Sequence, residues 1–508
     1  MNPHRCGGVL TRTMLSILLG HSYFLRLDHK QWKRAKPYPP LATLQVAARL
    51  RALGHGVDLF DAMLADGTGE YERQLRRVVP QLVLLYEDNY NFLTKMCLAR
   101  MREAACRMVE AARRAGARVI VAGSDATDAP EAYLAAGADA VLAGEGIEAL
   151  EVLLERLDAC PSIGSADLIR GVPGVSSALD ATSGRVAGRP GGTRIPPARG
   201  ELPPPAWDLI DVERYRAVWR RAHGHFSLNM AASRGCSFRC SWCAKPIWGN
   251  HYLQRPAADV AAEMTRIKRD FAPDHIWFAD DIFGFRIDWV SEFAAALAVS
   301  GGSIPFTIQS RADLISERMA AALYEAGCRE AWLGAESGSQ RVLDAMNKGT
   351  RVAEINTARH RLGAAGIRVG FFIQLGYLGE ELSDILATRE LIETAQPDDV
   401  GVSVAYPLPG TKFHDLVRAQ LGDKTHWEAS GELAMMFQGT YTSPFYREVR
   451  DLLHEEVRIS SQGLALHGAI DRARRSLRRR WDHLLACQET FLNATPGTVA
   501  TAPAAGFP

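Results

Sequence analysis

The chain has 508 residues, of which 47% are hydrophobic, and its formal net charge at pH 7 is +1. At roughly 150 residues per domain, this length predicts about two to four domains. The balanced charge argues against a nucleic-acid-binding protein and against one held to an acidic membrane surface.

Short apolar runs alternate with amphipathic stretches over residues 14–158, which we expect to form the first domain. Five runs read as strands, so the alternation predicts a parallel, doubly wound α/β sheet. Ligands of such sheets bind beyond the carboxyl ends of the strands. Residues 123–131 and the glycines Gly144 and Gly146 lie at two of these ends, where glycine lets the backbone approach a ligand. Alternatively, Gly144 and Gly146 only shape a turn; the absence of GxGxxG argues against a dinucleotide.

The rest of the chain divides into four parts. Residues 159–221 are rich in proline and glycine and read as a linker. Six further strand-like runs alternate with helical stretches over 222–415 and predict a partial (β/α)6 barrel. Residues 416–490 read as a helical region, and 491–508 as a disordered tail. In the helical region, a core role is favoured over a substrate role for Met435, Met436, Phe437, Tyr441 and Phe445.

Three cysteines, Cys236, Cys240 and Cys243, fall in the loop after the first barrel strand. Thiolates ligate the irons of a [4Fe–4S] cubane, and three of them leave the fourth iron with an open position. An open position distinguishes a catalytic metal site from a structural one. The spacing therefore favours a catalytic cluster. Two alternatives remain, a chance grouping and a zinc site whose fourth ligand is His223 or His225.

The CxxxCxxC spacing after the first strand of a six-stranded partial barrel resembles that of the radical S-adenosylmethionine (SAM) superfamily, and Trp242 also fits the family form. The resemblance implies that SAM binds the open iron through its amino and carboxylate groups. It also implies that an electron from the cluster cleaves SAM to methionine and a 5′-deoxyadenosyl radical, which abstracts a hydrogen atom from the substrate.

The resemblance also places SAM contacts at the remaining strand ends. Asp280 and Asp281, in the stretch after Phe278, stand where many members bind the methionine amino group. Arg311 would pair with the SAM carboxylate, and Glu336 and Ser337 would lie near the amino or ribose groups. The adenine commonly rests near the fifth and sixth strand ends, here near Tyr406. Taken singly, each residue could equally be a structural ion-pair partner or helix cap. The expected cofactor-binding residues are Phe278, Asp280, Asp281, Arg311, Glu336, Ser337, Tyr406, Gly144 and Gly146.

The doubly wound domain before the barrel is similar to that of the cobalamin-binding radical SAM subclass, which includes anaerobic magnesium-protoporphyrin ester cyclases and methyltransferases. The resemblance implies cobalamin as a third cofactor, although the Asp-x-His-x-x-Gly motif that supplies an axial histidine elsewhere is absent. It also implies methyl transfer to an unactivated carbon or a cyclase-like oxidation of a small molecule.

The alternative is a cobalamin-independent enzyme such as an RNA-modifying methylthiotransferase. Those relatives carry extra cluster cysteines and a β-rich C-terminal module, which this sequence lacks. We expect an electron donor such as flavodoxin or ferredoxin and no nucleic-acid partner. No apolar run approaches the roughly 20 residues of a membrane span, and no signal-peptide pattern is present, so we expect a cytoplasmic protein.

Overall fold

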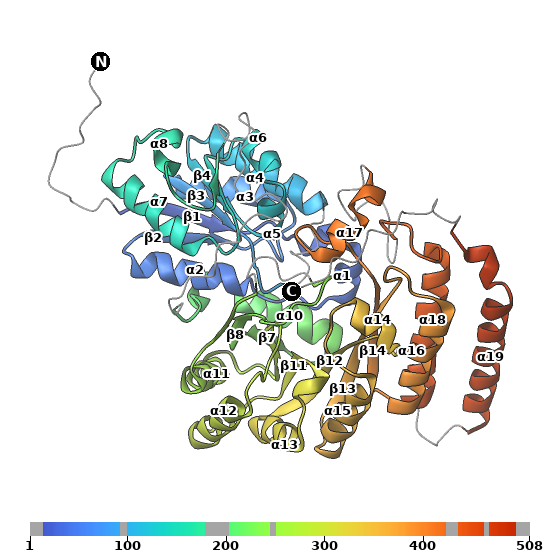
Figure 1. Ribbon diagram of the computed structural model, residues 1–508. Helices are drawn as coiled ribbons and strands as arrows, with labels where there is room; N and C mark the ends of the chain where they lie inside the picture. The colour runs from blue at the N-terminus through green and yellow to red at the C-terminus, as the bar shows by residue number, and fades with distance from the viewer. Residues whose placement is uncertain are drawn as a thin grey trace, which may run out of the picture.

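The computed structural model describes residues 14–91, 99–177, 203–243, 250–422, 435–461 and 467–493. Two six-stranded sheets organise these residues, each with helices packed on it (Figure 1). The predicted α/β class is therefore confirmed.

The first sheet has the strand order β2-β1-β3-β4-β5-β6. Every neighbouring pair is parallel except β5 and β6. The central strand β3 is buried at every position, as expected for an apolar strand covered on both faces. Its strands are β1 (Ser16–Gly20), β2 (Gly56–Phe60), β3 (Leu82–Tyr86), β4 (Arg118–Ala122), β5 (Ala140–Leu142) and β6 (Val175–Ser176). Its helices are α1 (His29–Arg34), α2 (Leu41–Ala52), α3 (Thr68–Val78), α4 (Ala99–Arg114), α5 (Ser124–Asp128), α6 (Pro130–Ala135), α7 (Ile147–Ala159) and α8 (Ser165–Ile169).

The segment that we expected to be a linker contributes to the fold. Its strand β6 adds an antiparallel edge to the first sheet, and its helix α10 (Val212–His223) lies between the two sheets. The Trp219 indole donates a hydrogen bond to the Pro37 carbonyl at 2.7 Å, and the Tyr215 hydroxyl donates one to Asp61. Helix α10 therefore joins the first unit to the barrel.

The second sheet has the order β14-β13-β12-β11-β10-β7 and is parallel throughout. β7 and β14 are its two edges, so the six strands form an open barrel. All six predicted strands are present: β7 (Ser227–Met230), β10 (His275–Phe278), β11 (Phe306–Ser310), β12 (Cys328–Glu336), β13 (Arg368–Leu375) and β14 (Asp399–Val404). Its helices are α11 (Ala257–Phe271), α12 (Ile287–Ser300), α13 (Glu317–Ala326), α14 (Gln340–Ala345), α15 (Val352–Ala364) and α16 (Leu382–Ala395).

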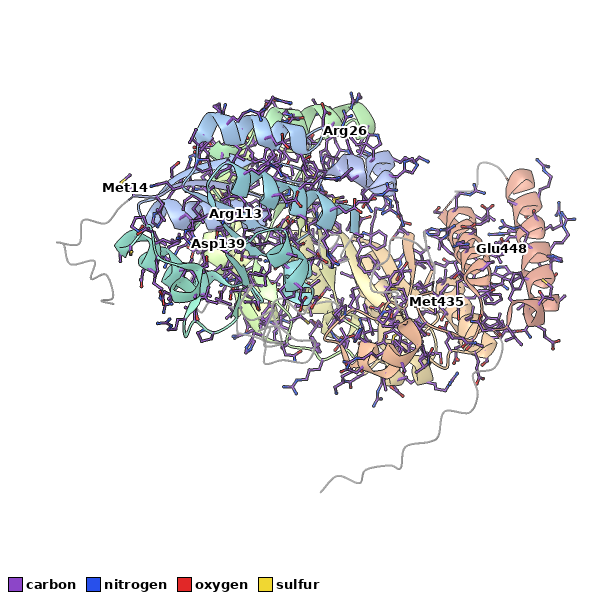
Figure 2. All side chains as sticks on the ribbon, turned by 90° about the horizontal axis from the view of Figure 1, so that it is seen from above. Met14, Arg26, Arg113, Asp139, Met435 and Glu448 are labelled. Atoms are coloured by element: carbon purple, nitrogen blue, oxygen red, sulfur yellow. The ribbon has the colours of Figure 1, made fainter. Side chains whose placement is uncertain are left out.

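The C-terminal region is helical, as predicted, with α17 (Lys412–Leu421), α18 (Ser443–Ser461) and α19 (His467–Ala486). α18 packs beside β14 and α16, and α19 packs on α18 at the side of the molecule (Figure 1). Phe437, Tyr441 and Phe445 are buried, and Tyr441 stacks on Phe445 with ring centroids 4.0 Å apart. These aromatic side chains therefore belong to the core. Figure 2 shows Met435 near the barrel and Glu448 on the helix pair. None of the helices described combines the length and apolar character of a membrane crossing.

Candidate functional site

The cysteine loop leaves the carboxyl end of β7 through a short strand, β8 (Ser233–Gly235). β8 pairs antiparallel with β9 (Tyr252–Gln254), which closes the base of the loop. Gly235 has φ +76, a left-handed conformation that glycine adopts without strain. Cys236 directly after it is buried, while Cys240 and Cys243 are half-buried. The chain turn therefore carries all three thiols to the carboxyl end of the barrel.

Backbone hydrogen bonds tie this loop to two other strand ends. The Ser241 amide donates to the Met346 carbonyl at 2.8 Å, and the Phe413 amide donates to the Ser241 carbonyl at 2.9 Å. The Asn347 side chain donates to the Arg239 carbonyl at 2.8 Å. These contacts hold the cysteines in place from segments that follow β12 and β14.

The histidines of the zinc alternative are engaged elsewhere. His223 Nε2 lies 3.0 Å from the Arg34 carbonyl oxygen, and its ring packs on Trp219 together with that of His225. Across the described ranges, no three His, Cys, Asp or Glu side chains converge on a point where one metal ion would bind. The donor set, three thiols spread along one loop, suits a multi-iron cluster better than a single ion.

Asp280 lies at the carboxyl end of β10 with only 1% of its surface exposed. Its carboxylate accepts hydrogen bonds from the Ala232 amide at 3.0 Å and from the Ser233 hydroxyl. Burial raises the pKa of Asp280 to about 7, against the lowering effect of these hydrogen bonds. Asp280 thus fastens the start of β8, and its neighbour Asp281 is exposed.

Arg311 follows β11 and is 6% exposed. Its guanidinium forms a fork with Asp313 at 2.9 and 3.0 Å. It also donates to the Lys348 carbonyl at 2.8 Å and to the Thr350 hydroxyl at 2.9 Å. The remaining nitrogen, Nη1, lies 3.8 Å from Cys240 Sγ, so one hydrogen is left to meet a SAM carboxylate.

Glu336 ends β12 in a left-handed conformation, φ +61, next to a register shift against β13. Its carboxylate accepts a 2.8 Å hydrogen bond from the Lys348 ammonium, and both side chains are 7% exposed. Burial acts to lower the pKa of Lys348, but the charges of Glu336 and Cys240 outweigh it and the pKa is raised. A Cβ on Gly334 would lie 2.6 Å from the Lys348 nitrogen and 2.7 Å from Glu336 Oε1, so a side chain at this position would displace the ion pair from its present place.

Three other expected cofactor residues lie in packed surroundings. Phe278 is fully buried with its ring 4.6 Å from that of Phe283. The Ser337 hydroxyl is buried 3.2 Å from that of Thr388 on α16. Tyr406 is half-buried against the core after β14. All three residues lie at or just after the carboxyl end of a barrel strand. Their contacts with SAM stay predictions.

The first sheet contacts the cysteine loop through the turn after β5. Glu145, between Gly144 and Gly146, is 2% exposed and forms an ion pair with Arg234 of β8. Gly146 has φ +69, and a Cβ there would lie 2.7 Å from Leu142 Cβ. Both glycines therefore shape the turn that presents Glu145, which links the first sheet to the residue two positions before Cys236.

The same edge of the first sheet holds buried polar atoms that lack a partner among the described residues. The Ser124 hydroxyl after β4 is of this kind, and both polar atoms of Asn89, after β3, lack a well-formed hydrogen bond although this side chain interacts with Tyr86. A buried polar group without a hydrogen bond is costly, so such atoms favour a polar ligand at this edge. Residues 92–98, which come a few positions after Asn89, lie outside the described ranges.

Sequence reasoning missed several of these residues, namely Glu145, Arg234, Lys348 and Asn89. Glu145 and Arg234 are 89 positions apart in sequence, and no local pattern pairs them. Lys348 stands in a short turn between α14 and α15, where an exposed lysine is the usual expectation. Asn89 directly after the β3 run had a usable signal, since ligands gather beyond strand ends.

Comparison with known proteins finds similarity over the barrel and over most of the chain. Residues 230–392 match the Radical SAM superfamily. An uncharacterized methyltransferase of Pyrococcus horikoshii is 24% identical over 384 residues, which are 74% of this chain and 77% of that protein. Three further curated relatives are matched over less than half of their own length.

Two solved structures share the fold of both units. The radical SAM methyltransferase TsrM of Kitasatospora setae superposes with a TM-score of 0.61 at 18% identity, covering 79% of this chain and 74% of that one. The cobalamin-dependent radical SAM enzyme OxsB gives 0.64 at 15% identity, covering 94% and 71%. Residues 230–392 are thus similar to the Radical SAM superfamily, and the chain shares its fold with two solved radical SAM enzymes, TsrM and OxsB.

Proposed function

We propose that this chain is a cobalamin-dependent radical SAM methyltransferase that acts on a small molecule. The observation that carries the proposal is the buried contact between the turn after β5 and the start of the cysteine loop, Glu145 with Arg234. It brings the ligand-binding edge of the first sheet against the base of the cysteine loop. A methyl group handed from one cofactor to the other needs such proximity.

Cys236, Cys240 and Cys243 would hold a [4Fe–4S] cluster, which supplies the electron that cleaves SAM. The chain's own residues keep the loop rigid: Asp280 anchors β8, and the Met346 and Ser241 backbone contacts fix the opposite side. Rigid placement matters because the cluster's open iron and SAM must meet in one geometry.

The SAM contacts are proposed at the barrel edge. Asp281 is the exposed carboxylate there and stands beside the buried Asp280, which suits it to accept hydrogen bonds from the SAM amino group. Arg311 retains one donor for the SAM carboxylate. The remaining contacts are proposed for Phe278, Asp280, Glu336, Ser337 and Tyr406, which lie at successive strand ends.

Cobalamin is proposed at the carboxyl edge of the first sheet. TsrM was solved with cobalamin and OxsB with aqua-cobalamin. Here the edge offers the side-chain amide of Asn89, which lacks a well-formed hydrogen bond, and the hydroxyl of Ser124, both of which fit the amide groups that fringe a corrin. Gly144 and Gly146 keep the neighbouring backbone without side chains. We also propose that the chain receives electrons from a donor such as flavodoxin or ferredoxin and that it has no nucleic-acid partner.

The test is anaerobic reconstitution with iron and sulfide, followed by SAM, reductant and hydroxocobalamin. We expect bound iron, a corrin retained through gel filtration, and methylcobalamin formed from SAM. An Asn89→Leu variant should lose the corrin while keeping its iron, and the exposed substitution Glu148→Gln on α7 should lose neither. Release of 5′-deoxyadenosine with no retained corrin would instead indicate a cobalamin-independent radical SAM enzyme.

A further inference from the structure

Arg311 is held beside the cysteine loop from two directions. Its Cζ lies 3.7 Å from the centroid of the Phe238 ring, and Phe238 stands between Cys236 and Cys240. Its Nη1 lies 3.8 Å from Cys240 Sγ, within hydrogen-bonding range for sulfur. The guanidinium therefore contacts the loop through both a ring face and a thiol.

The other nitrogens of Arg311 are committed to the barrel. Nε and Nη2 donate hydrogen bonds to the Asp313 carboxylate, and Nη2 also donates to the Lys348 carbonyl and the Thr350 hydroxyl. A guanidinium has five N–H donors in a rigid plane and does not lose its charge in proteins. Anchoring three of them fixes the direction of the fourth, so the contact with Cys240 is a property of the fold.

We infer that Arg311 is a positioning residue that raises the reduction potential of the cluster by donating an N–H to Cys240 Sγ. The inference deepens the proposed function and rests on its assignment of Cys240 as a cluster ligand. Arg311 would thereby make the cluster easier to reduce by an external, low-potential one-electron donor.

The physical basis is electrostatic. One electron from the donor would reduce a cluster held by the three thiolates, which would gain one negative charge, and no bond to Arg311 would form or break. Hydrogen bonds to the sulfurs and the local charge are what set the potential of such clusters. Since Arg311 is buried, solvent screens its charge weakly. Arg311 therefore stabilises the reduced state more than the oxidised one.

The experiment is a potentiometric titration of the reconstituted enzyme, followed by the EPR signal of the reduced cluster. We expect Arg311→Gln to bind as much iron as the wild type and to titrate at a more negative potential. The titration is run without SAM, so that loss of the proposed contact between Arg311 and the SAM carboxylate does not affect the measured potential. Arg311→Lys should recover part of the shift, because it restores the charge without the planar fork. The matched control is Arg359→Gln. Arg359 lies on the outer helix α15 and forms an ion pair with Asp398, and its loss should leave the potential unchanged.

Each outcome decides between the inference and its alternatives. An iron-loaded Arg311→Gln enzyme with an unchanged or higher potential overturns the inference and leaves the proposed function standing. Wild-type protein without bound iron overturns both. If Arg311→Gln cannot load the cluster, wild-type enzyme with isotope-labelled arginine decides: a nitrogen hyperfine coupling to the reduced cluster that Arg311→Lys lacks supports the inference, and its absence refutes it.

Discussion

Both sheets gather polar side chains at their carboxyl edges, but their strand orders differ and so do the charged groups found there. At the first edge, buried carboxylates dominate: Glu87 accepts hydrogen bonds from the amide and hydroxyl of Ser22, and Asp88 accepts one from the Ala42 amide at the start of α2. Burial raises the pKa of Asp88 to about 6. At the second edge, the buried cations Arg311 and Lys348, paired with Asp313 and Glu336, stand beside Cys240.

This difference shows what a parallel sheet decides and what it leaves open. The strand direction gathers polar side chains at one edge of each sheet. The charge of those side chains then decides which ligand fits, because a buried charge needs a compensating partner. Cations beside thiols suit an anionic iron–sulfur cluster, whereas hydrogen-bonded carboxyls and side-chain amides suit a large neutral or polar ligand.

The largest effect should come from removing a thiol at the barrel edge. We expect Cys240→Ala to abolish the reductive cleavage of SAM and to lower the iron content after reconstitution, because the proposed cluster would lose one of its three ligands. Cys160→Ala, which removes a half-buried cysteine after α7 in the first unit, should leave both unchanged. Intact SAM cleavage in Cys240→Ala would show that the cluster lies elsewhere.

The next effect concerns the buried cation at the same edge. Lys348→Met leaves the Glu336 carboxylate buried without its partner, which should lower the free energy of unfolding by about 3 to 5 kcal/mol. Adding Glu336→Gln should recover much of this loss, since the unpaired charge is then gone. Urea unfolding of both variants measures the difference; equal losses would mean that the ion pair is not the cause.

The contact between the two edges should have a smaller effect. Glu145→Gln leaves Arg234 buried with a neutral partner, which should cost about 2 kcal/mol. Because this ion pair joins the two units, we also expect thermal unfolding to broaden or to split into two transitions. Glu148→Gln, three residues along the chain and exposed, is the control. A single, unshifted transition in Glu145→Gln would argue that other contacts, such as those of α10 and of Asn229 with Pro39, couple the units.

A final effect, measured as a slope and not as a single loss, is a pH dependence carried by Asp280. Its folded pKa of about 7 lies above the unfolded value of about 3.9, so the folded state binds the proton more tightly. The stability that this group contributes is present below pH ~4 and is lost as the pH rises toward 7, by up to ~1.4 kcal/mol per pH unit. Asp280→Asn should flatten this slope in chemical unfolding at pH 5 to 7. An identical slope in the variant would mean that other groups carry it.

Much of the fold was predictable because it depends on local patterns. The alternation of apolar runs and amphipathic stretches predicted all six strands of the barrel and the five parallel strands of the first sheet. The edge strand β6 was not predicted, because it has only two residues, in a segment rich in proline and glycine, and so shows no periodicity. The cysteine spacing predicted a loop at the barrel's carboxyl end, and β7 and β8 place it there.

The sequence by itself determined the order of helices and strands, the edge of each sheet at which polar side chains gather, and the three thiols of the loop. Only the tertiary structure decided which side chains meet there: Arg311 with Cys240, Lys348 with Glu336, and Arg234 with Glu145. The physical reason is range. Periodicity and turn chemistry act between near neighbours in the chain, whereas a buried ion pair forms between residues that packing brings together from distant segments.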